Sequence, residues 1–312
     1  DTDHSKLIEM LEDVNDYSIP IEDTVEKWFD TENLYYWMAF HILIGNVDTQ
    51  ARNYFIYSPL NLNKFYFISW DNDGAFDLTE NEVRGISGRN GSWQTGISNY
   101  WGVVLFQRMY KNEEYRNGLT EVIETLRTQY LTEEKINNLV NTYRQGVKPY
   151  VYSIRDILYA RLTDDEYDIV ADALAGEIQQ NYQFYLESLE KPMPFYIAVP
   201  TQENGQLTLS WDAAYDFDNE NITYTVELAS DALFQNMIFS QQNIRVPQVT
   251  TTSLPEGQYF IRVRATNESG YTQDAFDYYV VETNDSYKIY STKCFYVLAD
   301  GTIEEDIYDE GE

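Results

Sequence analysis

The sequence predicts an α+β protein whose first part is mainly helical and whose second part is a β-sandwich. Apolar residues recur at helical spacing in most segments up to about residue 190. The run KPMP at 191–194 ends this pattern, and the alternation typical of strands follows it. With 312 residues, the chain is long enough for two domains with separate cores. We expect domains at 1–190 and 193–283, and a C-terminal extension at 284–312.

Helices account for most of the first part. In TENLYYWMAFHILI (31–44) the apolar residues fall on one face, His41 lies among them as a core histidine, and Asp30 or Thr31 is the expected N-cap. Two β-rich runs, YFIY and KFYFISW, follow and are joined by SPLNLN, so we expect a hairpin over 54–70. Residues 80–99 are rich in Gly, Ser and Asn and predict a loop, after which helical patterns resume.

Short alternating runs fill the second part, among them LTLSW, ITYTVEL, QYFIRVRA and FDYYVV. Trp211 in LTLSWD, the run TYTVELASD and the run GQYFIRVRA resemble strands B, C and F of a fibronectin type III-like domain, a β-sandwich of the immunoglobulin-like type. This resemblance covers 193–283. Between 284 and 312 there are eight acids and two lysines, and we expect an extra strand or two around KIYSTKCFYVL before a disordered acidic end.

Charge and cysteine content exclude several classes of function. The chain has 52 acidic and 21 basic residues, a net charge of −31, which repels nucleic acid and anionic membranes and favours cations or basic protein segments as partners. Solubility is the simpler explanation for most of these acids. Cys294 is the single cysteine, so an internal disulfide and a cysteine-based zinc site are excluded. No run approaches the ~18 apolar residues of a membrane span, so we expect no membrane insertion.

Two acidic clusters in aromatic and β-branched surroundings are the candidate site. GNVDTQARNYFIY (45–57) places Asp48 five positions before Asn53, and WDNDGAF (70–76) follows the hairpin. In phosphoryl transfer, an Asp accepts the proton of the attacking hydroxyl and an Asn five positions later supplies an oxygen to Mg²⁺. Protein kinases continue with a hairpin and then an Asp-Gly segment whose Asp binds the metal, and the same order occurs here.

The combined run of GNVDTQARNYFIY, a hairpin and ISWDNDGAF resembles the signature of the CotH kinase family, which comprises spore coat protein H and its relatives. LFQRMYKNEEYRNGLTEVIETLRTQYLTEEKINNLV is similar to the helical C-terminal region of that family. The resemblance covers about 1–190. It implies a mostly helical, kinase-like C-lobe with a short β-hairpin.

Carried over to this sequence, the resemblance makes Asp48 the catalytic aspartate and Asn53 and Asp71 metal ligands. Asp73 binds a second metal or orients Asp71. The metal implied is Mg²⁺ or Mn²⁺, because both prefer oxygen ligands, and ATP is the implied phosphoryl donor. Asn46 and Trp70 belong to the motif and are expected to hold the loop in shape.

The sequence also departs from the kinase pattern. Gln50 stands where kinases usually have a Lys that contacts phosphate, and Arg52 is the candidate to supply the missing positive charge. Only 47 residues precede Asp48, they have helical patterns, and no glycine occurs before Gly45. A nucleotide-covering glycine loop is therefore absent from this stretch. The chain opens DTDHSKL, so we expect it to be a piece cut from a longer precursor. We expect this piece to lack the N-lobe and to be inactive by itself.

Three functions remain open on the sequence. The first is an atypical secreted kinase that phosphorylates Ser or Thr on an extracellular or spore-coat protein at the bacterial cell surface. The second is a non-catalytic surface or coat protein with a pseudokinase-like lobe and an adhesive sandwich, associated with cell wall or polysaccharide. The third is a Ca²⁺-stabilised surface protein, since YDFDNEN places Asp216, Asp218 and Glu220 on one loop, for which an ordinary solvated turn is the alternative.

Overall fold

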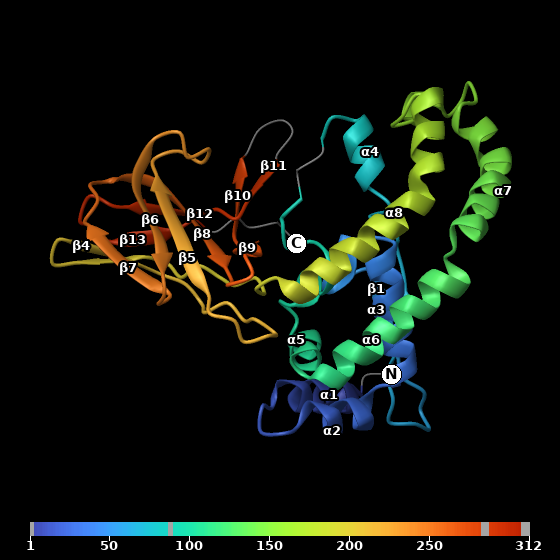
Figure 1. Cartoon of the computed structure of the whole chain (residues 1–312), viewed down its shortest axis with the longest axis horizontal. Helices are drawn as coiled ribbons and strands as arrows, with labels where there is room; N and C mark the ends of the chain where they lie inside the picture. The colour runs from blue at the N-terminus through green and yellow to red at the C-terminus, as the bar shows by residue number, and fades with distance from the viewer. Residues whose placement is uncertain (1–2, 87–89, 282–286, 307–312) are drawn as a thin grey trace. The chain divides into compact units, whose positions relative to one another are not determined.

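The computed structural model describes residues 3–86, 90–281 and 287–306. It forms two compact units: Asp1–Ser87 with Thr95–Leu186, and Gly88–Gln94 with Glu187–Glu312. The first unit is mainly helical with one hairpin, and the second is built of antiparallel strands (Figure 1). This confirms the predicted α+β class. Within the described ranges, none of the helices combines the length and the apolar character that crossing a bilayer requires.

The helices of the first unit alternate with short helical turns. Its longer helices are α1 (Ser5–Asn15), α2 (Ile21–Trp28), α3 (Thr31–Leu43), α4 (Leu78–Val83), α5 (Val104–Lys111), α6 (Glu113–Thr125), α7 (Glu133–Val151) and α8 (Asp164–Glu190), the last of which continues into the second unit. Its short turns are the 3₁₀ helices η1 (Val47–Gln50), η2 (Gly96–Tyr100) and η4 (Ile157–Tyr159), and the π-helical turn η3 (Leu126–Tyr130).

Helix α3 is the central element of this unit and carries the chain into the candidate site. Asp30, one of the two predicted candidates, is its N-cap, and its side chain accepts a hydrogen bond from the backbone N–H of Asn33 at 2.9 Å. The predicted hairpin is also confirmed, because β1 (Tyr54–Tyr57) pairs antiparallel with β2 (Tyr66–Ser69). Trp37 of α3 packs against Phe67 of β2 with ring centroids 4.8 Å apart, which fixes the hairpin on the helix.

Within 80–99, the described residues are more ordered than the composition of this stretch predicts. Helix α4 covers its beginning and η2 its end. Between them, residues 90–94 fold with the second unit: Trp93 is 8% exposed and packs edge-on against Phe276 at 5.0 Å. The hydroxyl of Ser92 donates a hydrogen bond to Asp274 at 2.9 Å. The chain therefore leaves the helical unit, attaches to the strands and returns.

The second unit is a sandwich of two main sheets. One sheet has the strand order β3-β4-β7. The other has the order β13-β12-β8-β5-β6, and β9 pairs with β8 as a sixth strand. The strands are β3 (Thr201–Glu203), β4 (Gln206–Ser210), β5 (Thr223–Ala229), β6 (Met237–Ile244), β7 (Gln248–Thr252), β8 (Gly257–Thr266), β9 (Thr272–Asp274), β12 (Lys293–Val297) and β13 (Ile303–Glu305). Trp211, Val226 and Ile261 belong to the buried core between the sheets. A three-stranded and a six-stranded sheet thus form a sandwich that resembles a fibronectin type III-like domain with added strands.

The C-terminal stretch takes part in the larger sheet. Strand β12 pairs with β8, where Phe295 stands opposite Tyr259, and β13 pairs with β12. A separate hairpin of β10 (Tyr278–Val281) and β11 (Tyr287–Tyr290) precedes them. The predicted disordered acidic end falls mainly on residues 307–312, which lie outside the described residues.

Candidate functional site

The loop with Asp48 begins at a tightly packed turn after α3. Gly45 has a φ of +67°, and a Cβ built on it would lie 2.6 Å from the side-chain nitrogen of Asn181. Asn181 comes from α8 and donates that same nitrogen to the carbonyl of Leu43 at 3.1 Å. A side chain at position 45 is thus excluded both by its backbone conformation and by its neighbour. The turn sets the direction in which the chain enters η1.

The turn η1 is held from both sides. Asn46 caps it, because its side-chain oxygen accepts a hydrogen bond from the N–H of Asp48 at 3.1 Å. From η2, the side-chain nitrogen of Asn99 donates to the carbonyl of Val47 at 3.1 Å, and the hydroxyls of Thr49 and Tyr100 lie 2.8 Å apart. Asp48 therefore stands on a short helical turn whose position is fixed by buried polar contacts.

The second acidic cluster contacts this turn. A Cβ built on Gly74 would lie 3.0 Å from Oδ2 of Asp48 and 3.3 Å from Oδ1 of Asn46. The side chain of Asn46 also donates a hydrogen bond to Oδ1 of Asn72 at 3.0 Å. The DNDG turn and the Asp48 loop, which lie 23 positions apart in sequence, thus meet directly. Glycine at 74 leaves room for the carboxylate of Asp48.

A buried histidine anchors the acidic turn to α3. The Nε2 atom of His41 lies 3.1 Å from Oδ1 of Asn72, and its Nδ1 atom lies 2.7 Å from the carbonyl oxygen of Trp37. His41 is 0% exposed, which confirms it as a core histidine, and burial lowers its pKa below the ordinary value. Asn72 was not among the site residues predicted from the sequence. Its position between two candidate ligands was the available signal.

Asn53 and Asp71 stand at the same end of the hairpin. Tyr54 pairs with Ser69, so Asn53, which directly precedes this pair, and Asp71, two residues beyond it, lie at the same end of the hairpin. Asn53 has a φ of +60° and Asp71 a φ of +51°, a left-handed conformation that few residues other than glycine adopt. Phe76, whose N–H donates to the carbonyl of Ile44 at 2.9 Å, has a φ of +58°. Strained backbone of this kind gathers at functional sites.

The candidate acids differ in their surroundings. The side chain of Asp48 is 39% exposed, and the guanidinium of Arg52 stands 4.0 Å from its carboxylate. This places the predicted phosphate-contacting Arg52 beside the candidate base. Asp71 and Asp73 are exposed, and within the described residues no hydrogen bond or ion pair engages their carboxylates. The side-chain oxygen of Gln50 is buried and, within the same residues, has no hydrogen-bond partner.

These residues fit a divalent cation that a nucleotide helps to hold. Among the described residues, no three His, Cys, Asp or Glu side chains are grouped closely enough to form a metal site by themselves. Mg²⁺ does not need such a cage, since it is commonly bound through one or two carboxylates, water and substrate phosphates. Asn53, Asp71 and Asp73 supply only oxygen ligands at one end of the hairpin, which suits Mg²⁺ or Mn²⁺.

One face of the hairpin adds an aromatic surface next to these ligands. Phe55 and Trp70 lie on it with ring centroids 5.1 Å apart, and Tyr57 shares the face. All three side chains are more than half exposed. The site thus combines a carboxylate on a fixed loop, oxygen ligands beside it and an apolar surface at its edge.

The acidic loop of the second unit is built differently. Asp216 is 7% exposed, and its Oδ1 accepts hydrogen bonds from the N–H groups of Asp218 at 3.0 Å and Glu220 at 3.1 Å. Its Oδ2 accepts a hydrogen bond from Asn267 at 3.1 Å. The carboxylate of Glu220 accepts hydrogen bonds from the N–H and hydroxyl of Ser269. These bonds account for Asp216 and Glu220 without a metal ion.

A comparison with known protein families identifies the family of this chain. The family described as "CotH kinase protein" matches residues 1–185, which is more than half of the chain, and the chain belongs to that family. A kinase family of this kind implies ATP and a metal ion. A solved structure titled "Structure of FN3tt mut" is 22% identical, with a TM-score of 0.19, over 28% of this chain and 92% of its own. No curated protein matches.

Proposed function

We propose that the protein is a metal-dependent phosphotransferase that moves the γ-phosphoryl group of ATP to a Ser or Thr hydroxyl. The observation that carries this proposal is the contact between the loop of Asp48 and the DNDG turn, through Gly74 and Asn72. Membership in the CotH kinase family supports the same chemistry. Of the sequence-derived functions, the kinase is the one that uses both clusters together.

The residues of the site divide the work of transfer. Asp48 accepts the proton of the acceptor hydroxyl while the hydroxyl oxygen bonds to the γ-phosphorus of ATP. The bond between that phosphorus and the bridging oxygen breaks, and ADP leaves with this oxygen. Asn53 and Asp71, with Asp73, hold the divalent cation, which when bound neutralises charge on the phosphates. Arg52 offers the positive charge that kinases usually take from Lys at the position of Gln50.

The substrate that we propose is an extracellular or spore-coat protein, and the proposed location is the bacterial cell surface or the spore coat. Support comes from the family, and the fibronectin type III-like domain is compatible with a surface role. An association with cell wall or polysaccharide through this domain is part of the same proposal.

The test is phosphate transfer by the full-length protein from labelled ATP, in Mg²⁺ or Mn²⁺, to a mixture of Ser- and Thr-containing acceptor peptides. Asp48→Asn and Asp71→Asn should each lower transfer about 10³-fold, within the range for loss of a general base or a charge-stabilising group. Asp165→Asn, an exposed acid on α8, is the matched control and should leave transfer unchanged. Transfer that survives Asp71→Asn would overturn the proposal.

A second measurement separates catalysis from ligand binding. Mn²⁺ binding, followed by electron paramagnetic resonance with and without ATP, should weaken in Asp71→Asn and remain in Asp165→Asn. Protein that neither binds Mn²⁺ with ATP nor transfers phosphate would instead support the non-catalytic surface or coat protein.

A further inference from the structure

An exposed apolar stripe runs along α7 and into the turn after it. Leu139, Tyr143, Val147, Tyr150 and Ile154 follow one another at intervals of three or four residues, which places them on one side of the helix. Each is at least 45% exposed, and Ile154 is 95% exposed. A helix of a soluble domain normally turns such a stripe toward a core. In α7 these side chains remain largely exposed.

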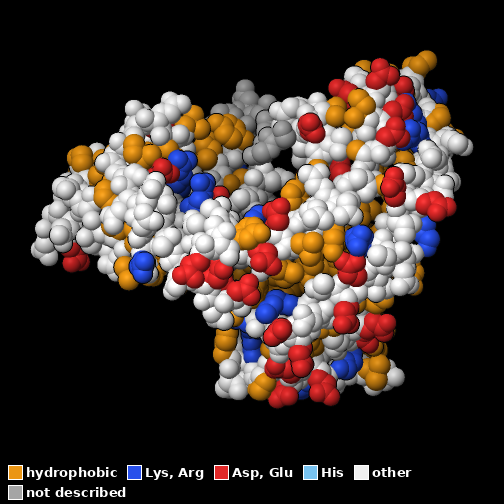
Figure 2. Space-filling view, in the orientation of Figure 1, with side chains coloured by type: hydrophobic (Ala, Val, Ile, Leu, Met, Phe, Trp, Pro, Cys, Tyr) orange, Lys and Arg blue, Asp and Glu red, His pale blue; other side chains and the backbone are white. Residues whose placement is uncertain are grey.

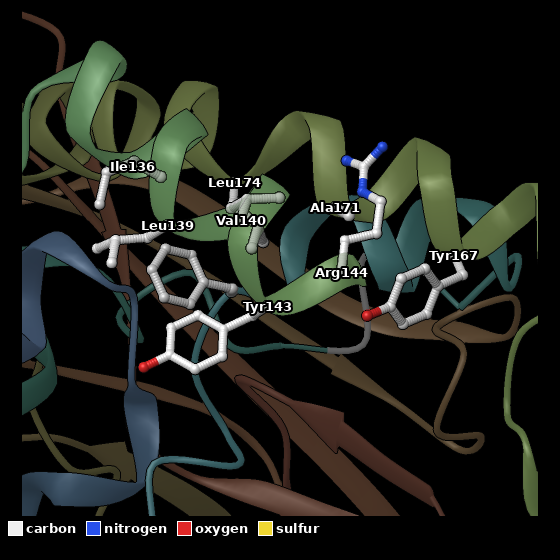
Figure 3. Close-up of a pocket in the computed structure, with 9 residues that line it drawn as sticks. Ile136, Leu139, Val140, Tyr143, Arg144, Tyr167, Ala171 and Leu174 are labelled. Carbon is white, nitrogen blue, oxygen red and sulfur yellow. The ribbon is translucent and has the colours of Figure 1, made fainter. Parts of the chain in front are cut away.

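A pocket opens next to the stripe, between α7 and α8. It measures about 260 Å³ and is lined mainly by Leu139, Val140 and Tyr143 of α7 and by Ala171 and Leu174 of α8 (Figure 3). This is smaller than the 300–1,000 Å³ that is usual for a drug-sized ligand. It suits a single apolar side chain that anchors a larger partner.

The pocket also touches the candidate site. Phe76, the last residue of WDNDGAF, contributes to its lining. The same residue has the left-handed backbone described above and binds the carbonyl of Ile44, four residues before Asp48. A side chain seated in the pocket would therefore contact the segment that carries Asp71 and Asp73.

Charge decides between the partners that an apolar groove could accept. The chain carries a net charge of −31, so a second copy and an anionic lipid surface are both repelled. Between 133 and 174, eight acids outnumber five bases. Two of those bases are already paired, because Lys148 binds Asp164 and Asp168 at 3.0 and 2.7 Å, and Arg144 binds Asp168 at 3.6 Å. Figure 2 shows acidic side chains interspersed with hydrophobic ones over this end of the helical unit.

We propose that the groove between α7 and α8 binds an amphipathic helix of a partner protein. The apolar face of that helix packs on the stripe, one large apolar side chain enters the pocket, and its polar face carries Lys or Arg toward the acidic rim. In this mode of binding, the groove contacts apolar side chains at positions i, i+3, i+4 and i+7 of the partner helix, and complementary charge selects the partner. The inference goes beyond phosphate transfer and does not depend on it.

The experiment measures binding of a fluorescent 18-residue Leu/Lys helix with one Trp on its apolar face. We expect binding at moderate salt that weakens at least tenfold in Tyr143→Ser and in Leu139→Ser. Both side chains are exposed, at 65% and 53%, so the fold should tolerate the changes. Tyr17→Ser is the matched control, since Tyr17 is 66% exposed and lies in the turn after α1, and it should bind as the unaltered protein does.

Two control peptides and two further measurements decide against the alternatives. Equal binding of a scrambled Leu/Lys peptide would show unspecific charge attraction and overturn the proposal, and equal binding of a Leu/Glu helix would overturn the choice of a cationic partner. Dimerisation that Tyr143→Ser abolishes in sedimentation would assign the groove to a second copy. Binding to phosphatidylserine vesicles that Tyr143→Ser abolishes would assign it to a membrane. Either of these results would also overturn the proposal.

Discussion

Two acidic turns in this protein have nearly the same composition and opposite construction. The turn at 71–74 follows β2 and exposes its carboxylates, while its uncharged members, Asn72 and Gly74, make the contacts that hold it. The turn at 216–220 precedes β5 and buries its first carboxylate, which accepts the hydrogen bonds that hold the turn. Uncharged residues thus fix the turn at 71–74 and leave its carboxylates exposed, whereas a buried carboxylate fixes the turn at 216–220.

The difference gives a practical criterion for acidic clusters. A carboxylate whose oxygens already accept two or three hydrogen bonds contributes to the fold and has little capacity left for a ligand. A carboxylate kept unengaged on a strained, well-anchored turn is available for a cation or a proton. By this criterion Asp71 and Asp73 are functional candidates, and Asp216 is structural.

The sharpest test of the comparison is the removal of a carboxylate from each turn. Asp216→Ala should lower the free energy of unfolding by about 2 kcal/mol, because it leaves Asn267 and two N–H groups without their acceptor. Asp73→Ala should change it by less than about 0.5 kcal/mol. Urea denaturation measures both. Equal effects of the two substitutions would remove the distinction between the turns.

Gly74→Ala tests the contact between the loop of Asp48 and the DNDG turn. The added Cβ would lie 3.0 Å from Oδ2 of Asp48, so the carboxylate must move by a few tenths of an ångström. We expect phosphate transfer to fall about tenfold, which is less than the 10²-fold typical of a 1 Å displacement. Gly176→Ala in α8, where a Cβ meets open space, should leave transfer unchanged and raise the free energy of unfolding by about 0.5–1 kcal/mol. Undiminished transfer in Gly74→Ala would contradict the proposed geometry.

Asp71→Gly should separate function from stability. Glycine adopts a φ of +51° without steric cost, and the relief should outweigh the entropy that glycine adds to the unfolded chain, by about 0.5 kcal/mol. The variant should therefore be slightly more stable and should not transfer phosphate. Thermal unfolding and the transfer assay check the two halves. Lower stability in both Asp71→Gly and Asp71→Asn than in the unaltered protein would show that this carboxylate supports the fold.

The smallest effect concerns the pH response of the turn at 216–220. Hydrogen bonds from the hydroxyl and the N–H of Ser269 hold the pKa of Glu220 below the ordinary 4.5. Its contribution to stability is therefore present above pH 4.5 and is lost as the pH falls through the lowered pKa. In Ser269→Ala the pKa of Glu220, followed by NMR, should move back up, while that of Asp231, lowered by its own backbone contacts, stays in place. An unchanged pKa of Glu220 would contradict this assignment.

Local chemistry explains what could be predicted from the sequence. The N-cap at Asp30 depends on one side chain and the N–H three residues later, and the hairpin depends on two β-rich runs with a turn between them. The change from helical to alternating spacing after 190 separates the two kinds of structure. The combined run of GNVDTQARNYFIY, a hairpin and ISWDNDGAF was enough to indicate the family, which the match over residues 1–185 confirms.

Contacts between distant residues explain what could not be predicted. His41 was expected in the core, and it is there, but its bond to Asn72 joins positions 31 apart in the chain. Composition misled at 80–99, where α4 and η2 flank a stretch rich in Gly, Ser and Asn. The pairing of β12 with β8 likewise depends on a sheet register that the local pattern of either strand does not specify.

The attachment of Trp93 to the strands has a practical consequence for anyone who wishes to separate the two halves. The polypeptide crosses between them three times, after Ser87, Gln94 and Leu186. A helical fragment that ends at residue 190 would lack the strands against which residues 90–94 pack. The indole of Trp93, which is 8% exposed in the whole chain, would then be exposed. The second unit therefore includes residues from two separate parts of the chain, and the two units should be expressed together.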